Sequence, residues 1–300
     1  MEIKEGYLPY RGYRTYYRIV GTPSEEKLPL LVLHGGPGCA HDYLESLDGI
    51  AEKYGRQVIY YDQCGCGKSR IPAGHADFYT YDSYMDEIEM VRKELNLDHI
   101  HMLGQSWGGM LEMLYVTRRN PAGIASMVVA SSPASAAIWV KEANRLRSYL
   151  PEDMQKALLQ ADEDGDYSKP EVVAASKEYY HRHVCKLDPY PDYVKRSFDQ
   201  MGEDYFVMQG ASEFVITGKM KDYDVTADLP NVKIPTLVTS GQLDENTPLI
   251  AKQVTDLIPG AKWVLFEGGT HNCHAEYPEK YNRTVEQFLE AHDGDKKGEE

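Results

Sequence analysis

The chain has 300 residues, of which 42% are hydrophobic, and a formal net charge of −15 at pH 7. This length allows one large or two ordinary domains with a sizeable core, and no apolar run approaches the ~20 residues that span a bilayer, so we expect a soluble, cytoplasmic protein. The negative charge argues against nucleic acid or an anionic membrane as a partner, because both require clustered Lys and Arg.

Strand and helix patterns alternate along the first 131 residues. Alternating apolar residues predict two strands over 6–20, with a turn near Arg11. Uniformly apolar runs predict buried strands at 30–33, 58–61, 100–103 and 125–130, and helical patterns lie between them, over about 41–54, about 82–95 and up to about 120. This alternation predicts an α/β fold with a mostly parallel sheet covered on both faces.

The alternation stops at residue 131 and resumes a hundred residues later. Residues 132–231 are helical and polar in pattern, which predicts an inserted helical cap. A strand at 234–240, a helix at 247–258, a strand at 263–266 and a helix at about 276–291 follow. We therefore expect a core of residues 1–131 and 232–292, and a charged tail, 293–300, that is disordered.

Residues 104–108 read Gly-Gln-Ser-Trp-Gly, a G-x-S-x-G pattern between a predicted strand and a predicted helix. This is the context of a nucleophile elbow, in which small residues two positions before and after the Ser allow a strained turn that exposes its Oγ. Ser106 is the candidate nucleophile. Alone, the pattern also fits a glycine-rich turn with Ser106 as a helix N-cap.

An acid and a base follow Ser106 in the order that this fold requires. Asp244 comes just after the strand at 234–240, and His271 just after the strand at 263–266. A neutral imidazole activates a Ser hydroxyl, and a carboxylate fixes its tautomer, so His271 is the candidate base and Asp244 its partner. His274 and Glu245 compete for these roles, but they lie further from the strand ends.

Acyl transfer also needs N–H donors for the developing oxyanion. In this fold they are the N–H of the residue after the nucleophile, here Trp107, and one from a glycine-rich loop after an earlier strand. Residues 34–38, His-Gly-Gly-Pro-Gly, form such a loop, and we assign the second donor to Gly36. A purely structural turn is the alternative.

Several motifs in this order resemble the prolyl aminopeptidase (proline iminopeptidase) family of α/β-hydrolases, which includes the archaeal tricorn-interacting aminopeptidase. They are the segments 34–38, 61–69, 104–109, 270–271 and 276–281. The resemblance covers about residues 7–291. It implies a serine aminopeptidase that releases an N-terminal residue, with proline favoured, from short peptides or aminoacyl amides by an acyl-enzyme mechanism, without a metal or organic cofactor.

The resemblance also implies that Glu213 and Glu245 bind the free α-amino group of the substrate. A solvated cap carboxylate, or an acid without substrate contact, is the alternative for each. Residues 210–214 read Gly-Ala-Ser-Glu-Phe, where relatives of the tricorn-interacting type have Gly-Pro-Asn-Glu-Phe, and Gln105 stands where many relatives have Gly or Ser. These departures allow a preference broader than proline. Three aromatic residues of the insertion line the pocket or belong to a core: Trp139, Tyr205 and Phe206.

Two other classes of function compete with this interpretation. An amino-acid amidase or a general esterase or amidase on small acyl substrates would not need the two glutamates, and a ligand sensor or scaffold would not turn over. The complete triad argues against the sensor. We expect a monomer.

Three other segments resemble phosphate- or metal-binding motifs, but their residues do not match the spacing that those motifs require. Residues 66–69 resemble the end of a phosphate loop, but Asp62 occupies the position of its first glycine. His181 and His183 would point to different faces of a helix, and residues 162–173 lack the glycine and glutamate of a calcium loop. The five cysteines are scattered and odd in number, so we expect free thiols.

Overall fold

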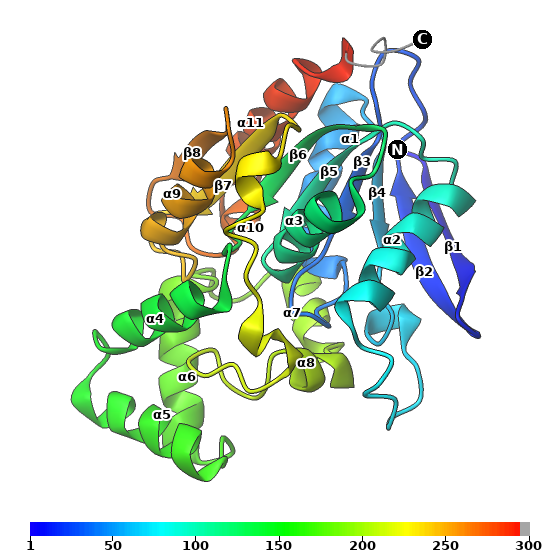
Figure 1. Cartoon of the computed structure of the whole chain (residues 1–300). Coiled ribbons are helices and arrows are strands. Elements are labelled where there is room, and N and C mark those ends of the chain that lie inside the picture. The colour runs from blue at the N-terminus through cyan, green and yellow to red at the C-terminus, as the bar shows by residue number, and fades with distance from the viewer. Residues whose placement is uncertain (295–300) are drawn as a thin grey trace.

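The computed structural model describes residues 1–294, and its centre is a sheet of eight strands in the order β1-β2-β4-β3-β5-β6-β7-β8 (Figure 1). β2 pairs antiparallel with β1 and β4, and the other neighbours are parallel. The strands are β1 (Ile3–Tyr10), β2 (Tyr13–Val20), β3 (Leu30–Leu33), β4 (Val58–Tyr61), β5 (Ile100–Gln105), β6 (Ile124–Ala130), β7 (Thr236–Gly241) and β8 (Lys262–Phe266).

Helices cover both faces of this sheet, which explains the uniformly apolar central strands. Leu30 and Val32 of β3 pack with α1 (Asp48–Tyr54) and α11 (Pro278–Glu290). Leu31 and Leu33 pack on the other face with α2 (Tyr81–Glu94), α3 (Trp107–Arg119) and α9 (Pro248–Leu257). Because successive strand residues point to opposite faces, every residue of β3 lies in a core. The predicted α/β fold is confirmed.

The segment between β6 and β7 is helical and gathers at one end of the sheet, below it in Figure 1. It contains α4 (Ala136–Arg147), α5 (Glu152–Asp164), α6 (Pro170–His183), α7 (Asp192–Asp199), α8 (Glu203–Met208) and the 3₁₀ turns Lys219–Asp222 and Leu229–Asn231. Apolar side chains of α4, α5 and α6 form a cluster of their own with Phe214. The segment therefore has a small core separate from the two cores of the sheet.

Two predicted helices are divided. The one at 41–54 is a 3₁₀ helix (Asp42–Leu47) followed by α1, and the last one is α10 (Cys273–Glu276) followed by α11. α11 begins at Pro278, whose missing N–H suits a first helical position but cannot continue the helix before it.

Asp293, the first residue of the predicted disordered tail, is instead held by hydrogen bonds. Asp293 accepts hydrogen bonds from both terminal nitrogens of Arg56, at 2.8 Å each, and its Oδ1 lies 3.1 Å from His101 Nε2. The rest of the predicted tail, residues 295–300, lies outside the described residues.

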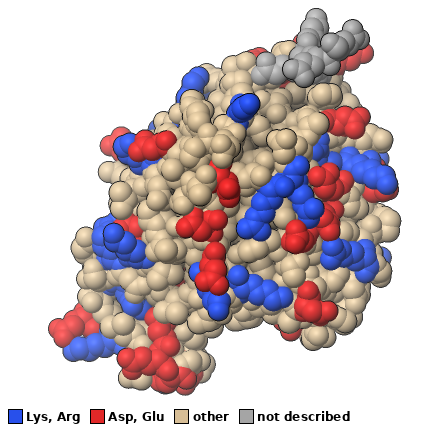
Figure 2. Space-filling view, viewed as in Figure 1, with Lys and Arg blue, Asp and Glu red and all other residues tan. Residues whose placement is uncertain are grey.

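Charge on the surface is mixed. On the face in Figure 2, Lys and Arg are interspersed with Asp and Glu. Among residues 1–294, no helix has the length and apolar composition to cross a membrane.

Candidate active site

The turn between β5 and α3 holds Ser106 in a backbone conformation that is rare for serine, with φ 56° and ψ −123°. Glycines on either side make this turn possible. A Cβ on Gly104 would lie 2.3 Å from the carbonyl oxygen of Gly108, and a Cβ on Gly108 would lie 2.0 Å from the carbonyl oxygen of Leu33. A strained serine at a strand-to-helix turn is the geometry of a nucleophile elbow.

Asp244 and His271 lie together after the ends of β7 and β8. His271 Nδ1 is 2.8 Å from Asp244 Oδ1, and both side chains are buried. Backbone N–H groups of Gly241 and Asn246 also donate to the Asp244 carboxylate, at 3.2 and 2.7 Å. A carboxylate can only accept here, so Nδ1 carries the proton and Nε2 is left to accept one.

His274, the competing candidate for the base, is buried among core side chains. His274 Nδ1 lies 2.9 Å from Ser46 Oγ, and its ring packs between those of Tyr43 and Tyr281. Burial lowers the pKa of His274 to about 3. A buried imidazole outside the cavity cannot reach a substrate, and Asp244 pairs with His271 rather than with His274.

One cavity of about 290 Å³ contains the candidate groups from both parts of the chain. The core contributes Gly36, Ser106, Trp107 and His271 to its wall. The helical segment contributes the three aromatic residues for which the sequence left two possibilities open: Trp139, Tyr205 and Phe206. The insertion therefore forms part of the cavity wall.

The loop after β3 presents one candidate oxyanion donor. Gly36 has φ 109°, and a Cβ there would lie 2.6 Å from the backbone nitrogen of Gly38. The Gly35 N–H already donates to the Tyr43 hydroxyl at 2.7 Å, which leaves the Gly36 N–H as the candidate. Trp107 is the first residue of α3, so no carbonyl of the helix accepts its N–H.

Gln63 joins this loop to Trp107 through hydrogen bonds. The backbone N–H of Gln63 donates to His34 Nε2 at 2.9 Å, and its side-chain amide donates to the carbonyl of His34 at 2.8 Å. The indole N–H of Trp107 donates to Gln63 Oε1 at 2.8 Å. Burial lowers the pKa of His34 to about 4, so the ring stays neutral and accepts.

The sequence did not predict a chain of hydrogen bonds that crosses the site. Tyr43, which no motif indicates, donates to Gln105 Oε1, and the Gln105 amide donates to the carbonyl oxygen of His271 at 3.2 Å. Gln105 therefore joins the glycine loop to the base, a role that its identity alone does not reveal. Of the other departures, Ala211 lines the cavity, whereas the Ser212 hydroxyl accepts from the Phe214 N–H at 3.1 Å.

Two carboxylates face the cavity, and among the described residues neither is paired with a Lys or an Arg. Glu213 Oε1 accepts from the Tyr205 hydroxyl at 2.6 Å, and Glu245 Oε1 lies 3.7 Å from His271 Nε2. Glu245 Oε2 and the Tyr179 hydroxyl are buried, and neither has a well-formed hydrogen bond among the described residues. Burial raises the pKa of Glu213, and burial together with the charge of Glu213 raises the pKa of Glu245 well above its usual range. Such a pair favours a bound cation.

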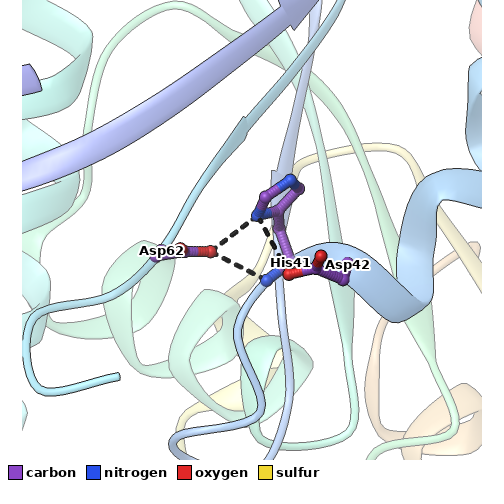
Figure 3. A group of neighbouring side chains, drawn as sticks. All are labelled: His41, Asp42 and Asp62. Carbon is purple, nitrogen blue, oxygen red and sulfur yellow. Dashed lines mark hydrogen bonds and ion pairs between the residues drawn. The ribbon is translucent and has the colours of Figure 1, made fainter. Parts of the chain in front are cut away.

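A cluster of metal-ligand types, His41, Asp42 and Asp62, lies outside the cavity, but its carboxylates are already paired (Figure 3). Asp62 Oδ1 accepts from the ring and the backbone N–H of His41, at 2.6 and 2.9 Å, and its Oδ2 accepts from the Lys68 N–H at 2.8 Å. Asp42 accepts from Arg196 at 3.0 Å and from Gln200 at 3.1 Å. The cluster is an ion-pair brace between the glycine loop region and α7.

Comparison with known proteins identifies the family of the chain. The family model described as alpha/beta hydrolase fold matches residues 29–278. Proline iminopeptidases of Lacticaseibacillus rhamnosus and Clostridioides difficile are each 44% identical to the chain, over 98% of its length and all of theirs. The crystal structure of a proline iminopeptidase from Mycobacterium smegmatis superposes with a TM-score of 0.90 at 37% identity, over 97% of this chain and 99% of that one.

Proposed function

The chain belongs to the proline iminopeptidase family of α/β-hydrolases, and we propose that it releases N-terminal proline from short peptides with Ser106, His271 and Asp244 as its catalytic triad. We further propose that residues 132–231 form a cap that admits only short chains with a free N-terminus. We also propose that the enzyme is a monomer, because a single chain supplies every group that the reaction needs.

In the proposed chemistry each of these groups has one step of acyl transfer. Ser106 Oγ attacks the first peptide carbonyl carbon while its proton passes to His271 Nε2, and the carbonyl electron pair moves onto oxygen. The N–H groups of Gly36 and Trp107 stabilise this oxyanion. The C–N bond then breaks as His271 gives its proton to the leaving amine, and water, activated in the same way, hydrolyses the acyl-enzyme.

The observation that carries the proposal is the pair of carboxylates in the cavity that holds Ser106. Prolyl substrates have a secondary ammonium with two N–H donors, and Glu213 and Glu245 supply two acceptors. A desolvated ammonium is costly unless paired, so these glutamates give specificity for a free N-terminus. Binding of the cation stabilises their ionised forms, against the effect of burial.

The test compares prolyl-β-naphthylamide with its N-acetyl derivative. We expect acetylation to lower kcat/KM by at least about 10²-fold, because it leaves the carboxylates unpaired. Ser106→Ala should abolish both turnover and labelling by a fluorophosphonate. Normal turnover in Ser106→Ala would refute the triad, and equal hydrolysis of both substrates would refute the amine anchor and favour a general amidase or esterase.

A panel of free alanyl, leucyl and phenylalanyl naphthylamides measures the preference among first residues. If proline dominates, Ala211 and Gln105 are compatible with the family's specificity. If several residues are released equally well, the pocket is broader, and the alternative of an amino-acid amidase gains support.

A further inference from the structure

Two consecutive serines follow β6, and neither belongs to the motifs of the site. In the sheet, β6 lies between β5, which leads to Ser106, and β7, which leads to Asp244 (Figure 1). The carboxyl end of β6 is therefore the one strand end adjacent to both the candidate nucleophile and the candidate acid. Ser131 and Ser132 occupy this position, and each is 1% exposed.

Ser131 contacts the acid. Its hydroxyl donates to Asp244 Oδ2 at 2.6 Å, and its backbone N–H donates to the carbonyl of Thr239 in β7 at 2.8 Å. The residue has φ 50°, in the left-handed region that a serine seldom adopts. Such strain persists only where the surrounding structure enforces it, and it is common at functional sites.

Ser132 contacts the nucleophile's backbone. Its hydroxyl lies 2.8 Å from the carbonyl oxygens of both Ser106 and Ala130 and can donate to either. A Cβ on Gly109 would lie 2.1 Å from this hydroxyl, so the second glycine of the elbow helix makes room for it. Neither serine is among the residues that line the cavity, whereas both contact groups of the candidate site.

We propose that Ser131 and Ser132 are positioning residues for the hydrolysis: Ser131 fixes the Asp244 carboxylate that orients His271, and Ser132 fixes the backbone turn that presents Ser106. This inference rests on the proposed triad. It extends the site to the end of a third strand, β6. It also explains why residue 109 is a glycine, because a side chain there would collide with the Ser132 hydroxyl.

The test measures kcat and KM on prolyl-β-naphthylamide for Ser131→Ala, Ser131→Gly and Ser132→Ala in the full chain. Loss of a hydrogen bond to a charged group should lower kcat by about 10- to 100-fold in both Ser131 variants, and loss of a neutral one by about 3- to 10-fold in Ser132→Ala, with KM within about twofold. The glycine variant relieves the strain at φ 50° but also lacks the hydroxyl. Active Ser131→Gly with inactive Ser131→Ala would therefore overturn the proposal.

Ser126→Ala is the matched control. Ser126 is a buried serine at the other end of β6, and its hydroxyl lies 2.8 Å from His101 Nδ1. We expect this variant to lose stability but keep kcat. If the Ser131 and Ser132 variants also keep kcat within about twofold, or if Ser126→Ala loses as much, the positioning role is wrong.

A double-mutant cycle tests whether Ser131 acts through Asp244. In the Asp244→Asn background, Ser131→Ala should lower the remaining kcat by less than about threefold further, because the carboxylate that it positions is gone. A full additional loss would show that Ser131 acts elsewhere. Normal turnover in Ser106→Ala would instead refute the triad itself, so the two failures are distinguishable.

Discussion

Replacing Glu245 with Gln separates two roles that its position allows. Its Oε1 lies 3.7 Å from His271 Nε2, which is close enough to influence the base. It also faces the cavity beside Glu213, where it would bind the substrate ammonium. Only the second role depends on the charge of the substrate.

The size of the effect follows from burial. Removing one partner of a desolvated charge pair costs about 2–5 kcal/mol, which corresponds to a loss of about 30- to 5,000-fold in kcat/KM. We expect Glu245→Gln to show a loss in this range on prolyl-β-naphthylamide. Glu213→Gln, whose Oε1 accepts from Tyr205, should show a similar loss.

The decisive assay uses an uncharged substrate of the same shape. The acyl group of p-nitrophenyl cyclopentanecarboxylate has a five-membered ring without the ammonium, and its activated ester makes slow turnover measurable. Glu245→Gln should hydrolyse this ester within about threefold of the wild-type rate. If the variant loses as much on the ester as on the prolyl amide, Glu245 acts on His271, and the amine anchor is refuted for this residue.

Three further predictions concern stability and the elbow. Burial raises the pKa of Glu87 to about 8, above its unfolded value, so its contribution to stability is greatest below about pH 4.5 and is lost as the pH rises through 8. Glu87→Gln should therefore flatten the decline in stability between pH 5 and 9, measured by urea denaturation. An unchanged pH dependence of stability would contradict the burial argument. Asp293→Ala should cost about 2–3 kcal/mol in the same assay, because the Arg56 guanidinium is fully buried, and a cost below about 0.5 kcal/mol would mean that the remaining partners suffice. Gly108→Ala should abolish fluorophosphonate labelling, because the new Cβ would lie 2.0 Å from the Leu33 carbonyl oxygen; retained labelling would show that the elbow can relax.

The fold was predictable because the dominant signals are local. Uniformly apolar β3 and β4, separated by a helical segment, indicate a sheet covered on both faces before any pairing is known. The boundaries were less predictable where a helix divides, as at Pro278, because one amphipathic pattern continues through both halves. Asp293 shows a different limit, since its partner Arg56 lies far away in the sequence and no local pattern joins them.

The three candidate triad positions were predictable for a topological reason. Parallel strands bring their carboxyl ends to one edge, so polar residues that directly follow strands must lie near one another. Glu213 lacks this constraint, because the packing of the helical segment decides where it lies. Only the family resemblance indicated its proposed role, and the contact with Tyr205 required the structure.

The contacts of Ser131 and Gln105 could not be predicted from the sequence, because the order of strands in the sheet differs from their order along the chain. Ser131 follows β6 as plainly as Asp244 follows β7, but its importance depends on β6 lying between β5 and β7. Gln105 adjoins the nucleophile, and its partners Tyr43 and His271 come from opposite ends of the chain. A hydroxyl or an amide pairs with whatever group tertiary packing brings within 3 Å, so its residue type carries little information about its role. Strand ends adjacent to both the nucleophile and the acid are therefore where positioning residues should be sought in an α/β-hydrolase whose strand order is known.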